Sequence, residues 1–339
     1  MARQPDAPRS LDARGRVVDV AVVIAAYQAE PFLAECMASV LAQSLQSFHL
    51  VIVDDGSTDG TLRIARSCAD ARVLVITGPN RGPAYARNAG VRAAAPSRYI
   101  AFLDADDVWD PPKLAVQTRF LDEHPEVVAV GCRMRYISSK GRVLGETGEL
   151  IDAEKQRAIA RGELFPFPTP SLMTLRTAFD AVGGFEEFLG TQGSEDLDLY
   201  ARLARYGQMV CLPSTLGSVR IHRRSLMSQR RREINRAARF VRQRLIARDQ
   251  GRDLTWEEFL RQHPPTWRER RRDLVERAYR RAALLYGERQ FPRALACFSA
   301  AALIDPTYTL RRAYLQRWRG STAARHASVI GHADAGRQE

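Results

Sequence analysis

From residue 20 to residue 104 the sequence alternates short apolar runs with segments in which apolar residues recur every three or four positions. The uniformly apolar runs are typical of strands buried on both faces, and the segments between them are typical of helices with one buried face. The predicted strands are 20–27, 49–55, 72–77 and 98–104, and the predicted helices are 31–43, 60–70 and 84–94. This alternation predicts an α/β fold on a mostly parallel sheet that helices cover on both sides.

The pattern is less regular after residue 104. A helix is predicted over 111–124, and Lys140-Gly141 has the composition of a hairpin turn between two apolar stretches. Beyond it, the sequence predicts short strands at 171–176, 209–213 and 217–222, with helices at 177–183 and 195–207. The second half of the domain therefore mixes short elements of both kinds.

Beyond about residue 228 the pattern is helical and rich in arginine, and the residues after about 320 are small and polar. We therefore expect four parts: a flexible N-terminal tail (1–16), an α/β domain (17–225), an all-helical, Arg-rich region (226–320) and a disordered tail (321–339).

One segment of the helical region has the character of a repeat. Its aromatic and small residues resemble the spacing of a tetratricopeptide helix pair, in which small residues let two helices approach closely. The residues concerned are Tyr279, Ala282, Leu285, Phe291, Ala294, Phe298, Ala301 and the pair Asp305-Pro306. Because only one such unit is visible, an ordinary helical hairpin is the interpretation that we favour.

The composition is that of a folded protein with a full core: 45% of the 339 residues are hydrophobic and 27% are charged. The longest apolar run, 20–27, is far shorter than the roughly 20 residues that span a bilayer. The first sixteen residues lack the apolar stretch of a secretory signal. The sequence therefore predicts a cytoplasmic protein, and its five unevenly spaced cysteines predict reduced, buried thiols rather than a zinc site.

The net charge of +12 is unevenly distributed. Residues 220–339 hold 28 of the 51 basic residues and only 12 of the 39 acidic ones. A nucleic-acid platform would interleave aromatic residues with the arginines, but 220–250 contains only Phe240, so we expect no nucleic-acid partner. A peripheral contact of the helical region with an anionic membrane is one hypothesis, and a solvated basic surface is the alternative.

Carboxylates follow two of the predicted strands at the point where each strand ends. Asp54 and Asp55 end the second strand, and Asp104, Asp106 and Asp107 follow the fourth. The carboxyl ends of parallel strands meet at the edge where open α/β sheets bind ligands. Turn and helix-capping chemistry explains the Ser and Thr that follow Asp54 and Asp55. A solvated acidic loop is the alternative interpretation of the second motif. Its clustered carboxylates favour a hard divalent cation such as Mg²⁺ or Mn²⁺.

A third acidic motif opens the predicted helix at 195–207. The helix macrodipole partly explains the adjacent Glu195 and Asp196, and an Asp in that position also suits a general base. No Gly-x-Gly-x-x-Gly and no phosphate-binding Gly-Lys-Ser/Thr loop follows the first strand, which argues against a dinucleotide fold.

Taken together, these motifs resemble glycosyltransferase family 2, which comprises inverting nucleotide-sugar enzymes with the GT-A fold. Six motifs keep the family's order over residues 17–225: the segment from VVIAAYQAE to VIVDDGSTDGT, then NRGPAYARNAG, FLDADD, GGFEE, SEDLDLYARLARYG and VRIH. The chain departs from the family in the first loop, where Ala25 and Gln28 replace the usual Pro and Asn that flank the aromatic residue.

The resemblance implies a donor site and a metal site. Tyr27 and Asp55 would contact the nucleobase, with Ala25 supplying backbone groups, and a uracil-type base (a UDP donor) suits this set. Asp104 would face the ribose or the metal, and Asp106 would be the more direct ligand of Mn²⁺ or Mg²⁺. Asp107 would support them or be structural.

The resemblance also implies catalytic roles. Asp196 would be the base that activates an acceptor hydroxyl, and His222 would lie near the metal or diphosphate, with a packed or surface histidine as the alternative. Arg81 would meet the donor diphosphate, and Arg87 and Asn88 would only hold the loop in place.

The sequence thus predicts a metal-dependent transfer of a sugar from a nucleotide-diphosphate sugar to a hydroxyl of a glycan or lipid-linked acceptor. A nucleotidyltransferase is the chemical alternative, although it would need a Gly-rich, basic loop after the first strand. A catalytically inactive binding module is the other alternative, against which the intact set Asp55, Asp104, Asp106 and Asp196 argues.

Overall fold

The computed structural model describes residues 18–222, 231–264, 266–287, 289–307 and 309. The described residues divide into two compact units, one formed by 18–134 with 148–219 and the other by 135–147 with the described residues from 220 onward. The predicted tails at 1–16 and 321–339 lie outside the described residues.

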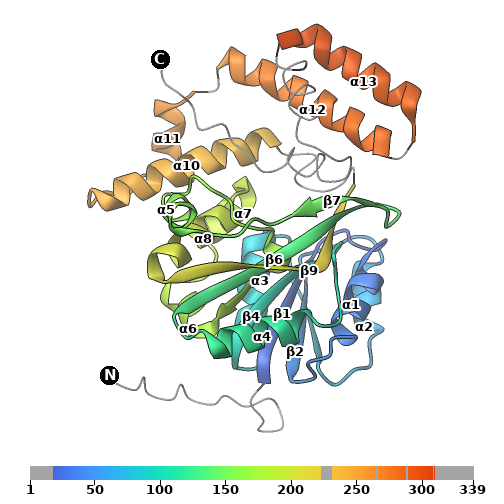
Figure 1. Cartoon of the computed structure of the whole chain (residues 1–339), viewed down its shortest axis with the longest axis vertical. Coiled ribbons are helices and arrows are strands. Elements are labelled where there is room, and N and C mark those ends of the chain that lie inside the picture. Colours follow the sequence, from blue (N-terminus) through green and yellow to red (C-terminus); the bar gives the residue numbers. More distant parts are fainter. Residues whose placement is uncertain (1–17, 223–230, 265, 288, 308, 310–339) are drawn as a thin grey trace. The chain divides into compact units, whose positions relative to one another are not determined.

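A mixed sheet forms the centre of the first unit (Figure 1). Its strand order is β3-β2-β1-β4-β8-β6-β9-β5, with β7 paired to β6. The pairs β3-β2, β2-β1 and β1-β4 are parallel, whereas β8 is antiparallel to both β4 and β6. The strands are β1 (Val18–Ala26), β2 (Phe48–Asp54), β3 (Val73–Thr77), β4 (Ser97–Asp104), β5 (Val108–Trp109), β6 (Val127–Ser138), β7 (Val143–Thr147), β8 (Met173–Leu175) and β9 (Gln208–Ile221). The predicted α/β class is confirmed, with the parallel pairing concentrated in the first four strands.

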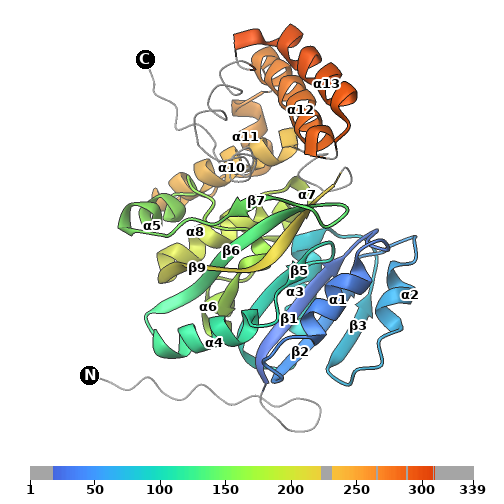
Figure 2. The ribbon, with the colours of Figure 1, turned by 45° about the vertical axis from the view of Figure 1, so that its right-hand side comes forward.

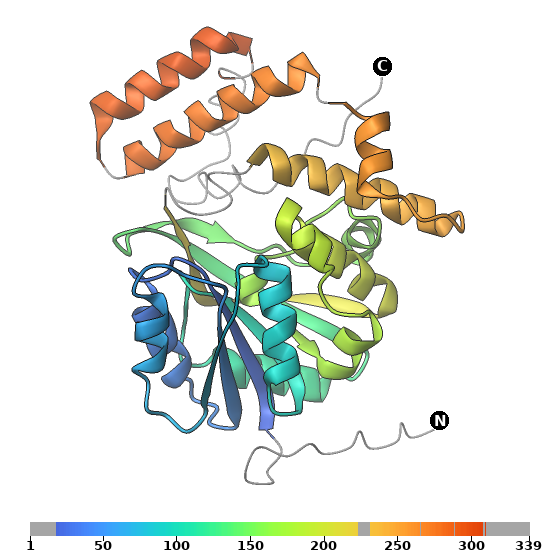
Figure 3. The same cartoon turned by 180° about the vertical axis from the view of Figure 1, so that it is seen from behind.

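Helices cover both faces of this sheet because the buried strands carry apolar side chains on both sides. On one face Ile24 of β1 packs in the same core as Leu33 of α1 (Leu33–Leu41), together with residues of α2 (Thr61–Arg66) and α4 (Lys113–Glu123). On the other face Phe102 of β4 packs against Phe179 of α6 (Arg176–Ala181), together with residues of α3 (Pro83–Ala93) and α8 (Glu195–Tyr206). The view from behind shows α3, α6 and α8 on this second face (Figure 3).

The structure differs from the predicted elements mainly after residue 104. The two strands predicted at 209–213 and 217–222 are one strand, β9, in which Pro213 and Ser214 are exposed. Four short elements were not predicted: β5, α5 (Ala153–Ala160), the 3₁₀ helix η1 (Thr169–Ser171) and α7 (Glu187–Gln192). The start of α5 has a recognisable signal, since the Asp152 side chain accepts a hydrogen bond from the Lys155 N–H, as helix N-cap residues do.

The described part of the second unit is helical apart from the β6–β7 hairpin and the end of β9. Its helices are α10 (Arg231–Asp249), α11 (Trp256–Gln262), α12 (Trp267–Gly287) and α13 (Phe291–Ile304). The Phe240 ring packs edge-on against the rings of Trp256 and Phe259, and α12 and α13 lie side by side (Figure 2). The predicted helical region is confirmed, while the resemblance of the α12–α13 pair to a tetratricopeptide unit stays a prediction.

Two predictions from composition concern cysteines and membrane spans. All five cysteines are free thiols; Cys36, Cys132 and Cys211 are buried, and Cys68 and Cys297 are partly exposed. In the part of the chain that the structure describes, no helix is both long and apolar enough to span a bilayer.

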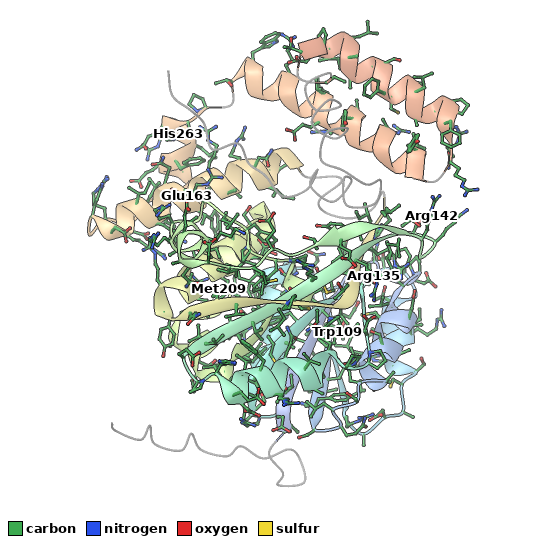
Figure 4. The ribbon with its side chains drawn as sticks, in the orientation of Figure 1. Trp109, Arg135, Arg142, Glu163, Met209 and His263 are labelled. Atoms are coloured by element: carbon green, nitrogen blue, oxygen red, sulfur yellow. The ribbon has the colours of Figure 1, made fainter. Side chains whose placement is uncertain are left out.

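A buried lysine lies between α4 and the sheet. Lys113 is fully buried, its Nζ donates to Gln117 Oε1 at 2.7 Å, and the Nζ lies 3.9 Å from the ring centroid of Trp109, which is labelled in Figure 4. Burial disfavours the ammonium form and lowers the pKa of Lys113 from 10.5 to about 8.

This lysine predicts a pH-dependent stability. Between pH 8 and 10.5 the unfolded chain keeps the Lys113 proton that the folded chain has lost, so the contribution of Lys113 to stability rises with pH over this interval, by about 3 kcal/mol in all. Lys113→Met removes this increase. Urea unfolding of both proteins at several pH values measures this increase as the difference between them. Both proteins retain Lys140 and Lys155, the other two lysines of the chain. Equal pH dependence in the two proteins would contradict the assignment.

Candidate functional site

The ends of β1, β2 and β4 are aligned at one edge of the sheet. In the strand register Ala25 of β1 lies beside Val53 of β2 and Asp104 of β4, and Ala26 lies beside Asp54. The segments that carry the predicted donor-binding and metal-binding residues therefore leave the sheet at the same edge, where α/β proteins bind ligands.

The first loop is held by Gln28, which has a positive φ of 51°. The Gln28 N–H donates to Ser57 Oγ at 3.0 Å, and its Oε1 accepts from the N–H groups of Thr58 and Asp59 at 3.0 and 3.2 Å. The preceding Tyr27 is 53% exposed. Gln28, which departs from the family pattern, thus joins the first loop to the loop after β2. The Tyr27 ring stays accessible for stacking.

The two aspartates at the end of β2 have different partners. Asp54 Oδ2 accepts from Thr77 Oγ1 at 2.8 Å, and its Oδ1 accepts from the Ser57 N–H at 3.3 Å. Asp55 accepts the N–H of Arg81 on Oδ1 and the N–H of Gly82 on Oδ2, both at 2.8 Å. Asp55 therefore also fixes the loop before α3, a role that sequence reasoning did not assign to it.

The carboxylates after β4 are gathered in a tight turn, in which the Asp107 N–H donates to the Asp104 carbonyl at 3.0 Å. The thiol of Cys36 lies beneath the turn and donates to the same carbonyl at 3.4 Å. Burial raises the pKa of Cys36, and the negative charges of Asp107, Asp106 and Asp104 raise it further. Asp107 is buried, whereas Asp104 and Asp106 are partly exposed, so these two are the better placed for a ligand.

A buried arginine links this turn to the start of α8. Arg87 of α3 donates from Nη2 to Asp104 Oδ1 at 2.7 Å and from Nη1 to Glu195 Oε1 at 2.8 Å. Burial acts to lower the pKa of Arg87, but the charges of Asp104 and Glu195 outweigh it and the pKa is raised. The sequence analysis expected Arg87 only to hold its loop and did not predict this link. In the sequence, the only indication of a buried cation is that Glu195 stands beside Asp196 as a second carboxylate.

The start of α8 places Asp196 beside this arginine. Ser194 has a positive φ of 68°, so the chain turns sharply before the helix begins. Asp196 accepts from the Leu197 N–H at 2.8 Å, and Thr169 Oγ1 lies 3.5 Å from Asp196 Oδ2. Burial raises the pKa of Asp196, and the positive charge of Arg87 opposes that shift. A carboxylate with this environment is partly desolvated yet stays near a fixed cation, which suits a base.

The buried link predicts a large stability loss when Arg87 is replaced. Arg87→Met leaves the carboxylates of Glu195 and Asp104 without their cation, which we expect to cost about 3–5 kcal/mol of unfolding free energy. Arg92→Met on the same helix is the matched control, because Arg92 is exposed and its 3.3 Å pair with Glu187 is worth at most about 1 kcal/mol. Urea unfolding of both variants measures the difference, and similar losses would show that Arg87 contributes no more than a surface pair.

Arg81, Asn88 and His222 are the remaining residues to which the sequence analysis assigned a role. The exposed guanidinium of Arg81 stacks 3.6 Å above the ring centroid of Tyr85. Asn88 accepts the Phe185 N–H and donates to the Phe185 carbonyl, so it holds the turn before α7 rather than the loop before α3 that the sequence analysis assigned to it. His222 directly follows β9 and belongs to the second unit. Its metal role stays a prediction.

The donor set fits a metal held jointly with a substrate. Among the described residues no group of three His, Cys, Asp or Glu side chains is arranged to hold a metal ion. Asp104 and Asp106 are nevertheless two oxygen donors at the strand edge, and Mg²⁺ or Mn²⁺ is commonly bound by one or two carboxylates together with substrate phosphates. The residues present therefore fit a hard divalent cation that a diphosphate helps to bind.

Comparison with known proteins identifies the family. The model of "Glycosyl transferase family 2" matches residues 21–183. The chain is 32% identical over 196 residues to "Putative glycosyltransferase EpsE" of Bacillus subtilis, covering 56% of this chain and 67% of that protein. It is 30% identical over 210 residues to an uncharacterized glycosyltransferase of Rickettsia felis, covering 60% of this chain and a third (33%) of that longer protein. It is 36% identical over 104 residues to the Escherichia coli UDP-Glc:alpha-D-GlcNAc-diphosphoundecaprenol beta-1,3-glucosyltransferase WfaP, covering 30% of this chain and 41% of that protein.

Solved structures with the same fold extend this comparison. S. aureus TarS 1-349 in complex with UDP-GlcNAc is 17% identical, with a TM-score of 0.56 over 86% of this chain and 91% of that one. The Pyrobaculum calidifontis mannosyltransferase PcManGT in complex with GDP-Man and Mn²⁺ is 20% identical, with a TM-score of 0.52 over 92% of this chain and 84% of that one. The fold likeness agrees with the sequence relatives, and the chain belongs to glycosyl transferase family 2.

Proposed function

We propose that this glycosyltransferase moves a sugar, with inversion, from a nucleotide-diphosphate sugar to a hydroxyl acceptor, using a divalent metal and Asp196 as general base. The observation that carries the proposal is the Arg87 link, which joins Asp104 at the end of β4 to Glu195 beside Asp196 at distances of 2.7 and 2.8 Å. Arg87 and Glu195 thus hold the donor-side carboxylate of Asp104 and the candidate base Asp196 at fixed positions. We assign this activity to residues 17–225.

The donor side comprises the ends of β1 and β2. The exposed Tyr27 ring stacks on the nucleobase, the backbone of Ala25 supports it, and Asp55 accepts a base N–H while it holds the loop before α3. This set favours a uracil-type base, and the UDP-GlcNAc complex of TarS and the name of WfaP agree with a UDP donor. Arg81 is the candidate for an outer contact with the diphosphate, from its stacked position on Tyr85.

The metal side comprises Asp104 and Asp106, with His222 as a third candidate ligand. A divalent ion bound there would supply Lewis-acid stabilisation of the charge that develops on the departing diphosphate. Arg87 holds Asp104 Oδ1, so it orients this carboxylate before any donor is bound. Cys36 and the buried Asp107 support the turn from below.

Asp196 acts on the acceptor. Its carboxylate removes the proton of an acceptor hydroxyl, which then attacks the anomeric carbon on the side opposite the diphosphate and inverts the configuration. Arg87 and the Leu197 N–H stabilise the ionised form of this carboxylate, against the burial that raises its pKa. The acceptor is a glycan or a lipid-linked saccharide, the class to which the acceptor in the name of WfaP belongs.

A donor panel tests the proposal. The full chain is incubated with UDP, GDP and dTDP sugars, with and without Mn²⁺, and thermal stabilisation and nucleoside diphosphate release are measured. We expect at least one donor to stabilise the protein and to be hydrolysed only when metal is present. Binding of free nucleoside triphosphates with release of pyrophosphate would instead favour a nucleotidyltransferase, and stabilisation without any turnover in the presence of saccharide acceptors would favour an inactive binding module.

A further inference from the structure

The turn between α12 and α13 carries an exposed aromatic pair. Tyr286 at the end of α12 and Phe291 at the start of α13 are 58% and 53% exposed, and their ring centroids lie 5.4 Å apart. Two exposed arginines, Arg289 and Arg293, flank Phe291. We call Tyr286, Arg289, Phe291, Arg293 and Leu295 the hairpin tip; these residues lie at or near the turn that joins α12 to α13, the two helices labelled in Figure 2.

The outer face of α13 continues this apolar surface. Ala294 and Ala301 are the buried side of the helix, and Ala301 packs in one cluster with Val275 and Tyr279 of α12. Leu295 and Leu303 on the outer side are 66% and 85% exposed, and Arg293 is the one charged residue in the sequence of α13. The side of α13 that packs against α12 already supplies the apolar contacts between the two helices. Packing between α12 and α13 therefore does not explain why the opposite side of α13 is apolar.

The sequence of the α12–α13 pair is rich in arginine. Residues 267–304 contain nine arginines and four acidic residues. Arg277 and Arg281 of α12 are exposed in addition to Arg289 and Arg293 of the tip. Exposed aromatic and aliphatic side chains together with exposed arginines on the same helix pair match an anionic bilayer surface, in which rings lie at headgroup level and guanidinium groups bind lipid phosphates.

We propose that the hairpin tip and the outer face of α13 form a docking surface for an anionic lipid bilayer. A second copy of the chain fits this surface less well, because a two-fold symmetric contact would bring the arginines of both copies into one interface, and α13 has no carboxylate to pair with them. A nucleic acid would leave Leu295 and Leu303 without apolar partners. The contact is peripheral, since α13 has 14 residues and the bilayer core needs roughly 20. Binding requires neither donor nor turnover, so it stands apart from the proposed function.

Vesicle co-sedimentation of the full chain tests this surface. We expect binding to vesicles of phosphatidylcholine with phosphatidylglycerol at low salt, weaker binding at physiological salt because the charges are screened over about 8 Å, and little binding to phosphatidylcholine alone. Arg289→Gln with Arg293→Gln lowers the partition coefficient roughly 30-fold. Phe291→Ser with Leu295→Ser lowers it about 10-fold or more, since it removes the apolar contact.

The matched control is Val143→Ser with Leu150→Ser. It removes two similarly exposed aliphatic side chains outside the α12–α13 pair, and we expect it to leave vesicle binding unchanged. Circular dichroism melts establish that each variant folds, and donor-induced thermal stabilisation establishes that its donor site is unaltered. Three results overturn the proposal: no binding of the wild type to anionic vesicles at low salt, equal losses in the tip variant and the control, or a vesicle-independent dimer that Phe291→Ser with Leu295→Ser dissociates.

Discussion

Asp196→Asn lowers the turnover number by roughly 10²–10⁴, the usual contribution of a general base, while donor and metal affinity change by no more than about threefold. The reason is chemical rather than structural. The amide is isosteric and can still accept the Leu197 N–H on its oxygen, but it cannot take up the proton of the acceptor hydroxyl. Steady-state kinetics and donor titration of the same preparations separate the two effects.

The pH profile provides a second readout. Burial raises the pKa of Asp196 above the ordinary Asp value of 3.8, so the rate falls as the pH drops through that raised pKa and the base becomes protonated. Asp180→Asn, an exposed carboxylate of α6 that pairs with Arg176, is the control and keeps both the rate and the profile. Loss of donor affinity in parallel with the rate would show that Asp196 is structural.

Asp106→Ala has the second large effect, a loss of metal-dependent turnover on the order of 10³-fold, because it removes a ligand and leaves the diphosphate charge less compensated. The apparent affinity for Mn²⁺ falls with it, which a merely structural residue would not cause. The measurement is turnover as a function of Mn²⁺ concentration, with chelator-treated wild type as the reference for zero metal.

Asp70→Asn is the control for this series, since Asp70 forms a surface pair with Arg72 away from the β4 turn. We expect it to keep the wild-type metal response. Wild-type turnover and an unchanged Mn²⁺ response in Asp106→Ala would refute the metal assignment while leaving the role of Asp196 open.

The parallel half of the fold was predictable because its signals are local. The strands at 20–27 and 98–104 are uniformly apolar, and the helix at 84–94 has one apolar face, so each element can be recognised from its own residues. The single strand β9 was not predicted, because Pro213 and Ser214 interrupt its apolar pattern although the backbone continues through them. Such continuity depends on neighbouring strands and not on the local sequence.

The site was predictable only in part, for the same reason. The carboxylates at 54–55 and 104–107 are recognisable from their positions after apolar runs. The Arg87 link joins residues that are 17 and 108 positions apart, and no local pattern reports such contacts. Gln28 was noted only as a departure from the family pattern, and nothing in its local sequence indicates that its side chain accepts two backbone N–H groups of the next loop.

The anomeric configuration of the first product tests the central claim most directly. An α-linked nucleotide sugar is incubated with the full chain and Mn²⁺ without an acceptor, so that water takes the place of the acceptor hydroxyl, and the released sugar is followed by proton NMR before it mutarotates. A single displacement promoted by Asp196 predicts that the β-anomer accumulates first and that Asp196→Asn releases it far more slowly. Initial accumulation of the α-anomer would contradict the account.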